Sequence, residues 1–301
     1  MPSEDLTGSL IAGYQLLERV GEGGTATVYR AQHAERGVCA VKVLRAKLRN
    51  DRTAVQRFLR EAAFGARVQH DGVVRTYDYG EADGLHYLAL EWAEGELLVK
   101  FVRRSGPLAP PLASTIIEQL AAALAAAHGA GIIHRDLKPE NIIYDPRTQR
   151  ARLLDFGIAR DAEAKPEERL TRTGFFVGTL QYVAPEALSG ELVGEPADIY
   201  SLATIAYFLL TTQLPYQGRS PRELFHQLLT QPPTPLSQAR RDLVFTRPVE
   251  EAVMRGLSRE PAKRQRSVVE FAQEFSAATS QTGPAARGGL MGSLKGLFGG
   301  R

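Results

Sequence analysis

A short polar stretch, residues 134–141, contains three side chains whose chemistry suits one phosphate group: Asp136, Lys138 and Asn141. Apolar residues precede and follow it, which predicts a polar loop held between two buried strand-like segments. A carboxylate can accept the proton of a hydroxyl group, an ammonium can neutralise a moving phosphate, and an amide oxygen can bind a metal ion. The stretch therefore predicts phosphoryl transfer.

A second acidic motif, Asp155–Phe156–Gly157, follows the short strand predicted for residues 152–154. A carboxylate at the end of a strand and close to a glycine suits Mg²⁺, which prefers oxygen ligands and shares them with phosphate. We therefore predict that Asp155 and Asn141 hold the metal.

Lys42 ends an alternating apolar strand pattern, and a buried ammonium without a partner would be costly. The next segment, 51–68, has apolar residues at helical spacing, and Glu61 lies at the border of that apolar face. Upstream, the turn predicted for 21–24 joins two strands and is rich in glycine, so backbone N–H groups can approach phosphate closely.

The order of these motifs resembles that of the eukaryotic-like (Hanks-type) protein kinases, and residues 134–141 match their catalytic loop. Residues 157–160 and 178–182 are similar to the bacterial serine/threonine subgroup. The resemblance covers 14–277. It implies an α+β, bilobal fold with a small β-rich N-terminal lobe containing one key helix, and a larger, mainly helical C-terminal lobe.

The resemblance also implies roles for the polar residues. Asp136 would be the base for the substrate hydroxyl group, and Lys138 would stabilise charge on the γ-phosphate. Lys42, held by Glu61, would fix the α- and β-phosphates of ATP. The Thr179 hydroxyl group would bridge Asp136 and Lys138, and it points to serine/threonine substrates.

ATP with Mg²⁺, or alternatively Mn²⁺, is the implied cofactor pair. Leu90 would be the gatekeeper, and backbone groups of Glu91 and Ala93 would bind adenine. The residues expected to contact the nucleotide are Val20, Gly21, Glu22, Gly23, Gly24, Val28, Ala40, Lys42, Leu90, Glu91, Ala93 and Ile143, with Val28, Ala40 and Ile143 sandwiching the base.

Two positions depart from the family pattern. Ala26 occupies the place of the third glycine in the loop, and Gly65 stands where a bulkier residue often packs against Phe156. Glycine inside a helix costs about 1 kcal/mol relative to alanine. We therefore expect the 51–68 helix to be loosely held.

An activation segment is expected from 158 to 183, closed by Ala184–Pro185–Glu186. Thr171 and Thr173 lie in its middle and are predicted sites of autophosphorylation. A phosphothreonine adds a charge of about −1.5 to −2 and would pair with Arg135 beside the catalytic aspartate.

Two further roles are structural. The resemblance pairs Glu186 with Arg264, and an apolar-flanked carboxylate needs such a cation. It also places Asp198 on a central helix, where the carboxylate would accept backbone N–H groups of the catalytic loop.

Two alternatives to a protein kinase are open. A pseudokinase would act as a binding scaffold, but such proteins usually lose a residue equivalent to Lys42, Asp136 or Asp155, and all three are present here. A small-molecule phosphotransferase would share the catalytic aspartate and asparagine. Such enzymes generally lack a threonine-rich activation segment.

Length and composition set the remaining bounds. With 301 residues, the chain is divided into a leader (1–13), an N-terminal lobe (14–91), a hinge and C-terminal lobe (92–277) and a flexible glycine-rich tail (278–301). Cys39 is the only cysteine, which excludes an intramolecular disulfide. The N-terminus lacks a signal-peptide pattern and no run of about eighteen apolar residues occurs, so a cytoplasmic location is expected.

The formal net charge of +3 gives no reason to expect a nucleic-acid partner. The expected partners are proteins that offer serine or threonine, together with forkhead-associated-domain proteins and a cognate phosphatase, as is common in this family. A kinase-domain dimer is left open. In the tail, Leu290, Leu294 and Leu297 recur at helical spacing, so a helix that touches a membrane is the alternative to a flexible segment.

Overall fold

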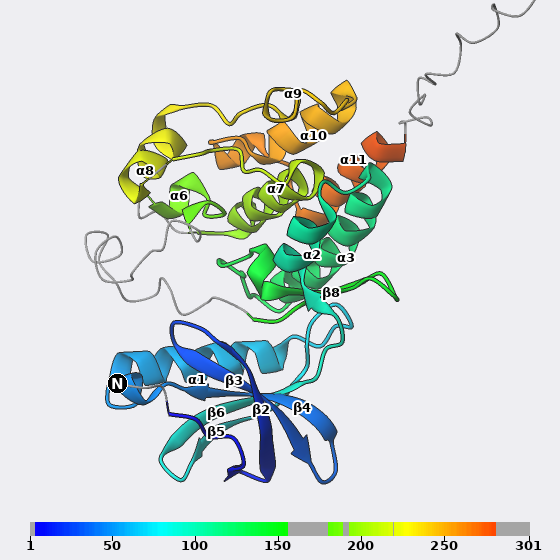
Figure 1. Cartoon of the computed structure of the whole chain (residues 1–301). Coiled ribbons are helices and arrows are strands. Elements are labelled where there is room, and N and C mark those ends of the chain that lie inside the picture. Colours follow the sequence, from blue (N-terminus) through cyan, green and yellow to red (C-terminus); the bar gives the residue numbers. More distant parts are fainter. Residues whose placement is uncertain (1–3, 156–179, 189–192, 219, 281–301) are drawn as a thin grey trace, which may run out of the picture.

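The computed structural model describes residues 4–155, 180–188, 193–218 and 220–280. An antiparallel sheet forms one end of the molecule and a group of helices forms the other (Figure 1). The two lobes are joined by a single crossing at residues 92–95, between the last strand of the first lobe and β7. This arrangement confirms the predicted bilobal α+β fold.

The N-terminal lobe is built on a six-stranded sheet in the order β1-β2-β3-β4-β6-β5. Along β4, Cys39, Val41 and Val43 are almost fully buried on one face, whereas Lys42 points to the other face. This alternation follows from the two-residue period of a strand, and it places the lysine on the helix-covered side. The strands are β1 (Leu10–Ile11), β2 (Tyr14–Glu22), β3 (Ala26–His33), β4 (Gly37–Leu44), β5 (Thr76–Ala82) and β6 (Leu85–Glu91).

The helix-covered face packs against α1 (Arg52–Arg67), which follows the short 3₁₀ turn η1 (Ala46–Leu48). Asp51 caps the helix, because its Oδ1 accepts hydrogen bonds from the N–H groups of Thr53 (2.9 Å) and Ala54 (3.2 Å). Phe58 and Ala62 are buried against the sheet. The helix predicted for 51–68 therefore forms, and it continues through Gly65.

The opposite face of the sheet is closed by residues that the sequence assigned to a separate leader. Ile11 in β1 is 1% exposed and pairs with Tyr14 of β2. The Leu6 N–H group donates to the Tyr29 hydroxyl group at 3.1 Å. The described part of the leader is therefore an edge of the N-terminal lobe, because its apolar side chains complete that core.

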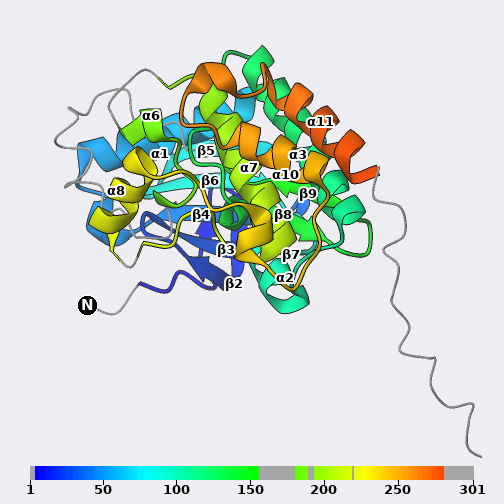
Figure 2. The ribbon, with the colours of Figure 1, turned by 90° about the horizontal axis from the view of Figure 1, so that it is seen from above.

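The C-terminal lobe is organised around α7 (Glu195–Thr211), which is buried along nearly its whole length. A helix with apolar residues all round must be enclosed, and α3 and α10 run beside it (Figure 2). The other helices are α2 (Leu98–Ser105), α3 (Pro110–Gly129), α6 (Pro185–Leu188), α8 (Pro221–Thr230), α9 (Leu236–Ala239), α10 (Arg247–Gly256) and α11 (Val268–Ser280), with the short 3₁₀ turns η2 (Pro139–Asn141) and η4 (Pro261–Lys263). Among the described residues, none of the helices combines the length and apolar character needed to traverse a bilayer.

A small antiparallel sheet of β7 (Glu96–Leu97), β8 (Ile142–Asp145) and β9 (Arg150–Leu153) lies between the helices and the hinge. Ile142 pairs with Leu153, and both are fully buried in the helical core. Their neighbours Ile143 and Arg152 also pair with each other, so they share the opposite face. That face carries one of the predicted adenine contacts.

Candidate active site

The polar stretch 134–141 forms a loop between α3 and β8, and Asp198 of α7 binds its backbone. Asp198 is fully buried, and its carboxylate accepts the N–H groups of His134 (2.8 Å) and Arg135 (3.0 Å). Arg135 has a left-handed backbone, with φ of 62°, which is rare for a residue with a side chain. The two hydrogen bonds that the sequence predicted for Asp198 therefore hold the loop in an unusual conformation.

The three polar side chains of the loop converge. The Lys138 Nζ lies 2.9 Å from the Asp136 Oδ2. The Asn141 Nδ2 donates to the main-chain carbonyl of Asp136 at 2.8 Å and to its Oδ2 at 3.2 Å. These bonds fix the aspartate between a cation and an amide, with 13% of its side chain exposed.

Lys42 forms an ion pair with Asp155 across the gap between the lobes. The resemblance implied Glu61 as the partner of Lys42, and that pairing stays a prediction, because the partner of Glu61 is not defined here. The contact with Asp155 joins β4 to the segment that follows β9, and sequence spacing does not encode that distance.

The residues proposed as metal ligands suit a hard cation. The Asn141 amide uses its nitrogen to hold Asp136, which turns its oxygen away from that contact. The Leu154 N–H group donates to the Asn141 carbonyl at 2.9 Å, which keeps Asp155 next to this asparagine. A carboxylate and an amide oxygen fit Mg²⁺. Within the described ranges, no cluster of three or more His, Cys, Asp or Glu side chains forms a separate metal site.

The glycine-rich hairpin has longer strands and a shorter turn than the sequence predicts. Gly21 pairs with Val28, and Glu22 continues the ladder, so the turn covers only 23–25. The Gly23 N–H group donates to the Ala26 carbonyl at 2.8 Å and closes it. Ala26 itself is 8% exposed, so the departure from the third glycine places a methyl group in the core next to α1.

The other expected nucleotide contacts lie on the strands of the N-terminal lobe, on the hinge and on β8. Leu90 is 4% exposed in the core under the sheet, as a gatekeeper would be. The N–H group of Glu91 donates to the Arg75 carbonyl at 2.9 Å, so this N–H group is already used within the protein, and the carbonyl stays a predicted contact of adenine. The Glu22 carboxylate forms ion pairs with Arg19 and Arg45. Val28, Ala40, Ala93 and Ile143 are partly exposed, and Val20 and Gly24 are exposed.

Burial controls the protonation of His134, the first residue of the loop. It is fully buried, and desolvation lowers its pKa below the ordinary 6.5, although Asp198 and Asp136 oppose this effect. Its Nδ1 accepts the N–H group of Asp136 at 3.4 Å. A neutral imidazole therefore supports the backbone of the catalytic aspartate.

The predicted ion pair between Glu186 and Arg264 is present and buried. Both guanidinium nitrogens bind the carboxylate, at 2.7 and 2.8 Å. The same guanidinium also donates to the carbonyls of Pro196 (2.7 Å) and Ser258 (2.8 Å), and it lies over the Tyr200 ring. This pair anchors the end of the activation segment to the rest of the lobe.

Three predicted residues, Thr171, Thr173 and Thr179, lie outside the described residues, as do Phe156 and Gly157. Arg135, the expected partner of phosphorylated Thr171 and Thr173, is described. Its Nε is buried and has no hydrogen-bond acceptor among the residues that the structure describes. A buried donor without an acceptor is costly, so this nitrogen suits an anion that is brought to it.

Two residues that matter for the geometry were missed. Arg152, in β9, forms a two-point ion pair with Glu91 at the hinge. His128, at the end of α3, places its Nε2 2.8 Å from the Asp198 carboxylate. Arg152 alternates with apolar residues along β9, as Arg150 does, so the pattern marks a polar face of the strand but does not reveal the pair with Glu91. No local pattern marks His128, because its partner is 70 residues away.

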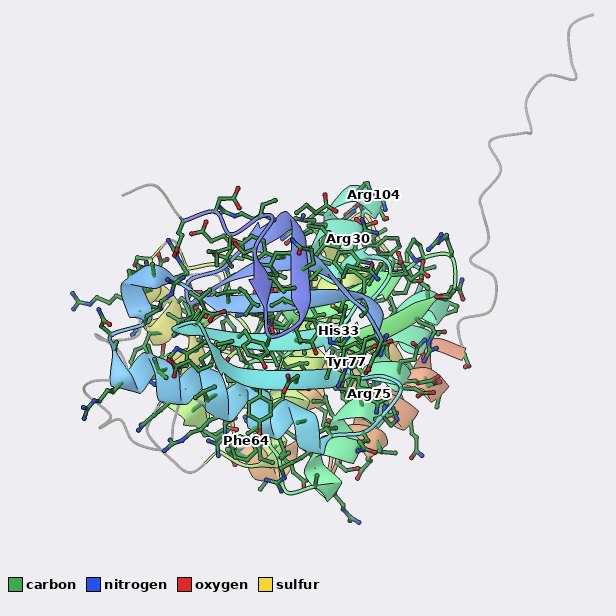
Figure 3. The ribbon with its side chains drawn as sticks, turned by 90° about the horizontal axis from the view of Figure 1, so that it is seen from below. Arg30, His33, Phe64, Arg75, Tyr77 and Arg104 are labelled. Atoms are coloured by element: carbon green, nitrogen blue, oxygen red, sulfur yellow. The ribbon has the colours of Figure 1, made fainter. Side chains whose placement is uncertain are left out.

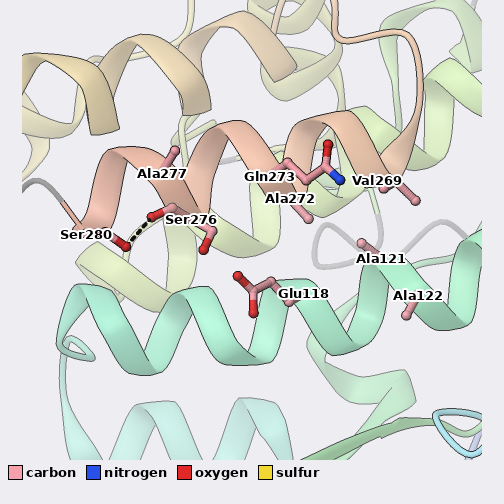
Figure 4. A pocket seen from close by; sticks show the side chains of 9 residues that line it. All are labelled: Glu118, Ala121, Ala122, Val269, Ala272, Gln273, Ser276, Ala277 and Ser280. Atoms are coloured by element: carbon pink, nitrogen blue, oxygen red, sulfur yellow. Dashed lines mark hydrogen bonds between the residues drawn. The ribbon is translucent and has the colours of Figure 1, made fainter.

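The described residues also form two hollows away from this gap. A groove of about 440 Å³ runs between α3 and α11, with Glu118 at its edge and small side chains such as Ala121 and Ala272 on its walls (Figure 4). A second hollow, of about 710 Å³, opens between the N-terminal segment and β4. Neither contains a residue predicted to contact the nucleotide.

Comparison with known proteins finds several that share the sequence and the fold of this chain. The protein kinase domain family matches residues 14–276. The serine/threonine-protein kinase pkn3 of Myxococcus xanthus is 36% identical over 91% of this chain, and PknH of Mycobacterium tuberculosis is 39% identical over 88%. The crystal structure of the Mycobacterium tuberculosis PknI kinase domain superposes with a TM-score of 0.71 at 30% identity, covering 90% of this chain and 98% of that one.

A second solved structure, of Rad53 residues 1–466 with AMP-PNP, matches with a TM-score of 0.72 at 25% identity, over 88% of this chain and 65% of that one. The curated relatives are longer than this chain, which spans 52% of pkn3 and 42% of PknH.

Proposed function

The chain belongs to the protein kinase family, among the bacterial serine/threonine kinases of the Hanks type, and on that premise we propose that it transfers the γ-phosphate of ATP to serine and threonine hydroxyl groups of proteins. The observation that carries this proposal is that the Lys138 ammonium and the Asn141 amide both bind one oxygen, Oδ2 of Asp136. A scaffold that had lost catalysis would have no need to keep these side chains in place.

Asp136 accepts the proton of the substrate hydroxyl group as the oxygen attacks phosphorus. Lys138 is within ion-pair distance of that carboxylate, so it can neutralise charge on the transferred group without a large movement. Lys42 provides a second positive charge from the other lobe and would bind the α- and β-phosphates. Most of the acceleration then comes from positioning and electrostatics, as in other phosphoryl transfers.

Asn141 and Asp155 would hold Mg²⁺, which neutralises the phosphate oxygens when it is bound. The oxygen chemistry of these two side chains supports Mg²⁺, with Mn²⁺ as a substitute. The nucleotide itself would be ATP, between Val28 and Ala40 above and Ile143 below. One structural relative, Rad53, was solved with AMP-PNP, an ATP analogue, which supports this choice for the present chain.

Activation would follow from phosphorylation of Thr171 and Thr173. The buried Nε of Arg135 supports this, because a phosphate provides the acceptor that the described residues do not offer. Thr179 would orient Asp136 and Lys138 toward a serine or threonine substrate. Protein substrates, forkhead-associated-domain proteins and a cognate phosphatase are the proposed partners.

We place this kinase domain in the cytoplasm, where ATP is available and where the buried thiol of Cys39 remains reduced. The tail predicted for 278–301 begins within α11, which continues to Ser280; the remainder lies outside the described residues.

The test is autophosphorylation with labelled ATP and Mg²⁺, in the wild type and in Asp136→Asn and Lys42→Met. We expect both variants to lose activity by at least about a hundredfold, and mass spectrometry to find phosphate on Thr171 and Thr173 in the wild type only. Arg247→Met is a matched control, since its ion pair with Glu251 is exposed and far from the loop.

A wild type that binds ATP but phosphorylates no protein would favour the scaffold alternative. Transfer to small alcohols or amino sugars but not to protein would favour the small-molecule phosphotransferase. Either result would contradict the proposed function.

A further inference from the structure

An ion pair with two hydrogen bonds, between Arg152 of β9 and Glu91, connects the hinge to the C-terminal lobe. The Nη1 and Nη2 of Arg152 donate to Oε1 and Oε2 of Glu91 at 2.7 and 2.6 Å. The guanidinium side chain is 18% exposed and the carboxylate 32%, so water screens the pair only in part. The fork of hydrogen bonds holds the pKa of Glu91 below its usual value, and the carboxylate stays ionised.

The pair is also bound to the loop between α1 and β5. Arg152 donates from Nη2 to the Val73 carbonyl at 3.1 Å, and Glu91 accepts the N–H group of Arg75 at 3.4 Å. Arg75 lies beside Tyr77 at the hinge end of β5 (Figure 3). The Leu153 N–H group donates to the Gly72 carbonyl at 2.8 Å, which ties the same loop to β9. One cluster of bonds therefore joins the hinge, the loop and the C-terminal lobe.

The register of β8 and β9 connects this cluster to the adenine position. Arg152 is directly opposite Ile143, the residue predicted to lie below the base, and their side chains share one face. Glu91 supplies the backbone carbonyl that is predicted to bind the edge of adenine. The ion pair thus links the residue below the base to the residue at its edge.

We propose that Arg152 and Glu91 are positioning residues for ATP: their ion pair sets the distance between the hinge carbonyl and Ile143, and so the dimensions of the adenine slot. The inference rests on the proposed ATP-dependent function. An ion pair with only an architectural role would affect folding alone. A positioning role predicts weaker nucleotide binding with little loss in the chemical step, because no reacting atom touches either side chain.

The experiment measures binding of AMP-PNP with Mg²⁺ by isothermal titration calorimetry, in Glu91→Gln, Arg152→Met and the double variant. We expect the Kd to rise at least about fivefold in each single variant, and no further in the double variant, because either change breaks the same fork. The autophosphorylation rate at saturating ATP should fall by less than about threefold. Arg152→Lys, which keeps the charge but loses the fork, should lie between the wild type and Arg152→Met.

Arg150→Met is the matched control. Arg150 is on the same strand and the same face, is mostly exposed, and makes no hydrogen bond to Glu91 within the described part of the chain. Its charge acts on Glu91 from a distance, and it donates to the Asp71 carbonyl at 3.4 Å, so the variant removes a nearby charge without removing the fork. Trp92, the only tryptophan, follows Glu91 directly, so its emission reports displacement of the hinge without nucleotide. We expect a shift of its emission in the Arg152→Met protein and none in Arg150→Met.

Three results would overturn the inference: a Kd within twofold of the wild type, tighter binding, or an equal rise in Arg150→Met. If Arg152→Met does not fold, Glu91→Gln and Arg152→Lys decide the matter, since both preserve the side-chain volume closely. A wild type that binds no nucleotide would instead refute the proposed function, so the two failures are distinguishable.

Discussion

Replacing Asp198 with asparagine tests how the catalytic loop is held in place. The carboxylate is fully buried and accepts three contacts, from the N–H groups of His134 and Arg135 and from the His128 ring. Asparagine has one oxygen and an NH₂ group that cannot accept a hydrogen bond, so at least one backbone N–H group is left facing another donor.

The expected loss can be worked from these contacts. A hydrogen bond to a charged group contributes about 1.5–3 kcal/mol, and a buried donor left without an acceptor costs about 1–3 kcal/mol. The left-handed backbone of Arg135, which the carboxylate supports, holds strain of about 1–3 kcal/mol, and release of that strain offsets part of the loss. Since part of the loop can relax, we expect Asp198→Asn to lose about 2–4 kcal/mol of unfolding free energy, out of a total of about 5–15 kcal/mol.

Urea unfolding, followed by circular dichroism, measures the stability, and labelled ATP measures the activity. We expect kcat to fall at least about a hundredfold because Asp136 loses its alignment, while the Kd for ATP changes by less than about threefold. Thr204→Val is the control on the same helix, because Thr204 is equally buried and, within the described ranges, its hydroxyl group bonds to the Tyr200 carbonyl of its own helix. An Asp198→Asn protein within about 1 kcal/mol and fivefold in kcat of the wild type would refute the reasoning.

Three further predictions concern stability. Arg264→Met leaves the carboxylate of Glu186 buried without its cation and should cost about 3–5 kcal/mol in urea unfolding. Gly95→Ala should lower the melting temperature and weaken ATP binding, because φ is 117° and the added Cβ would collide with the Tyr144 carbonyl. Burial lowers the pKa of His134, so the unfolded chain binds the proton more readily than the folded chain. The stability that this residue contributes is complete above about pH 6.5 and is lost as the pH falls. His134→Phe should therefore flatten the pH dependence of the unfolding free energy, measured from about pH 5 to 8.

Each of these has an outcome that contradicts it. A loss below about 1 kcal/mol in Arg264→Met, comparable to that expected for the exposed Arg247→Met, would mean that the buried pair is dispensable. An unchanged melting temperature in Gly95→Ala would show that the hinge can move away from β8. If His134→Phe retains the wild-type pH dependence, another group controls it.

The class of fold and the chemistry were encoded locally. Alternation along residues 38–44 placed Lys42 on one face of a strand, helical spacing in 51–68 defined α1, and the polar run 134–141 identified Asp136, Lys138 and Asn141. Each of these patterns depends on the period of one element or the composition of one loop, so a single sequence is enough to find it.

The family resemblance extended this to two distant contacts, the Glu186–Arg264 pair and the bonds of Asp198 to the loop. The partner that it implies for Lys42, Glu61, stays a prediction, whereas the structure gives Lys42 an ion pair with Asp155. Family motifs state which residues can meet, whereas the contacts that form depend on how the lobes and α1 are placed.

The sequence by itself therefore determined the catalytic side chains and the elements that carry them. Only the tertiary structure decided which of them meet across the lobes: the Lys42–Asp155 ion pair and the Glu91–Arg152 pair at the hinge. The physical reason is that an ion pair depends on a distance of a few ångströms between residues far apart in the chain, and that distance is set by the packing of whole elements rather than by any local pattern.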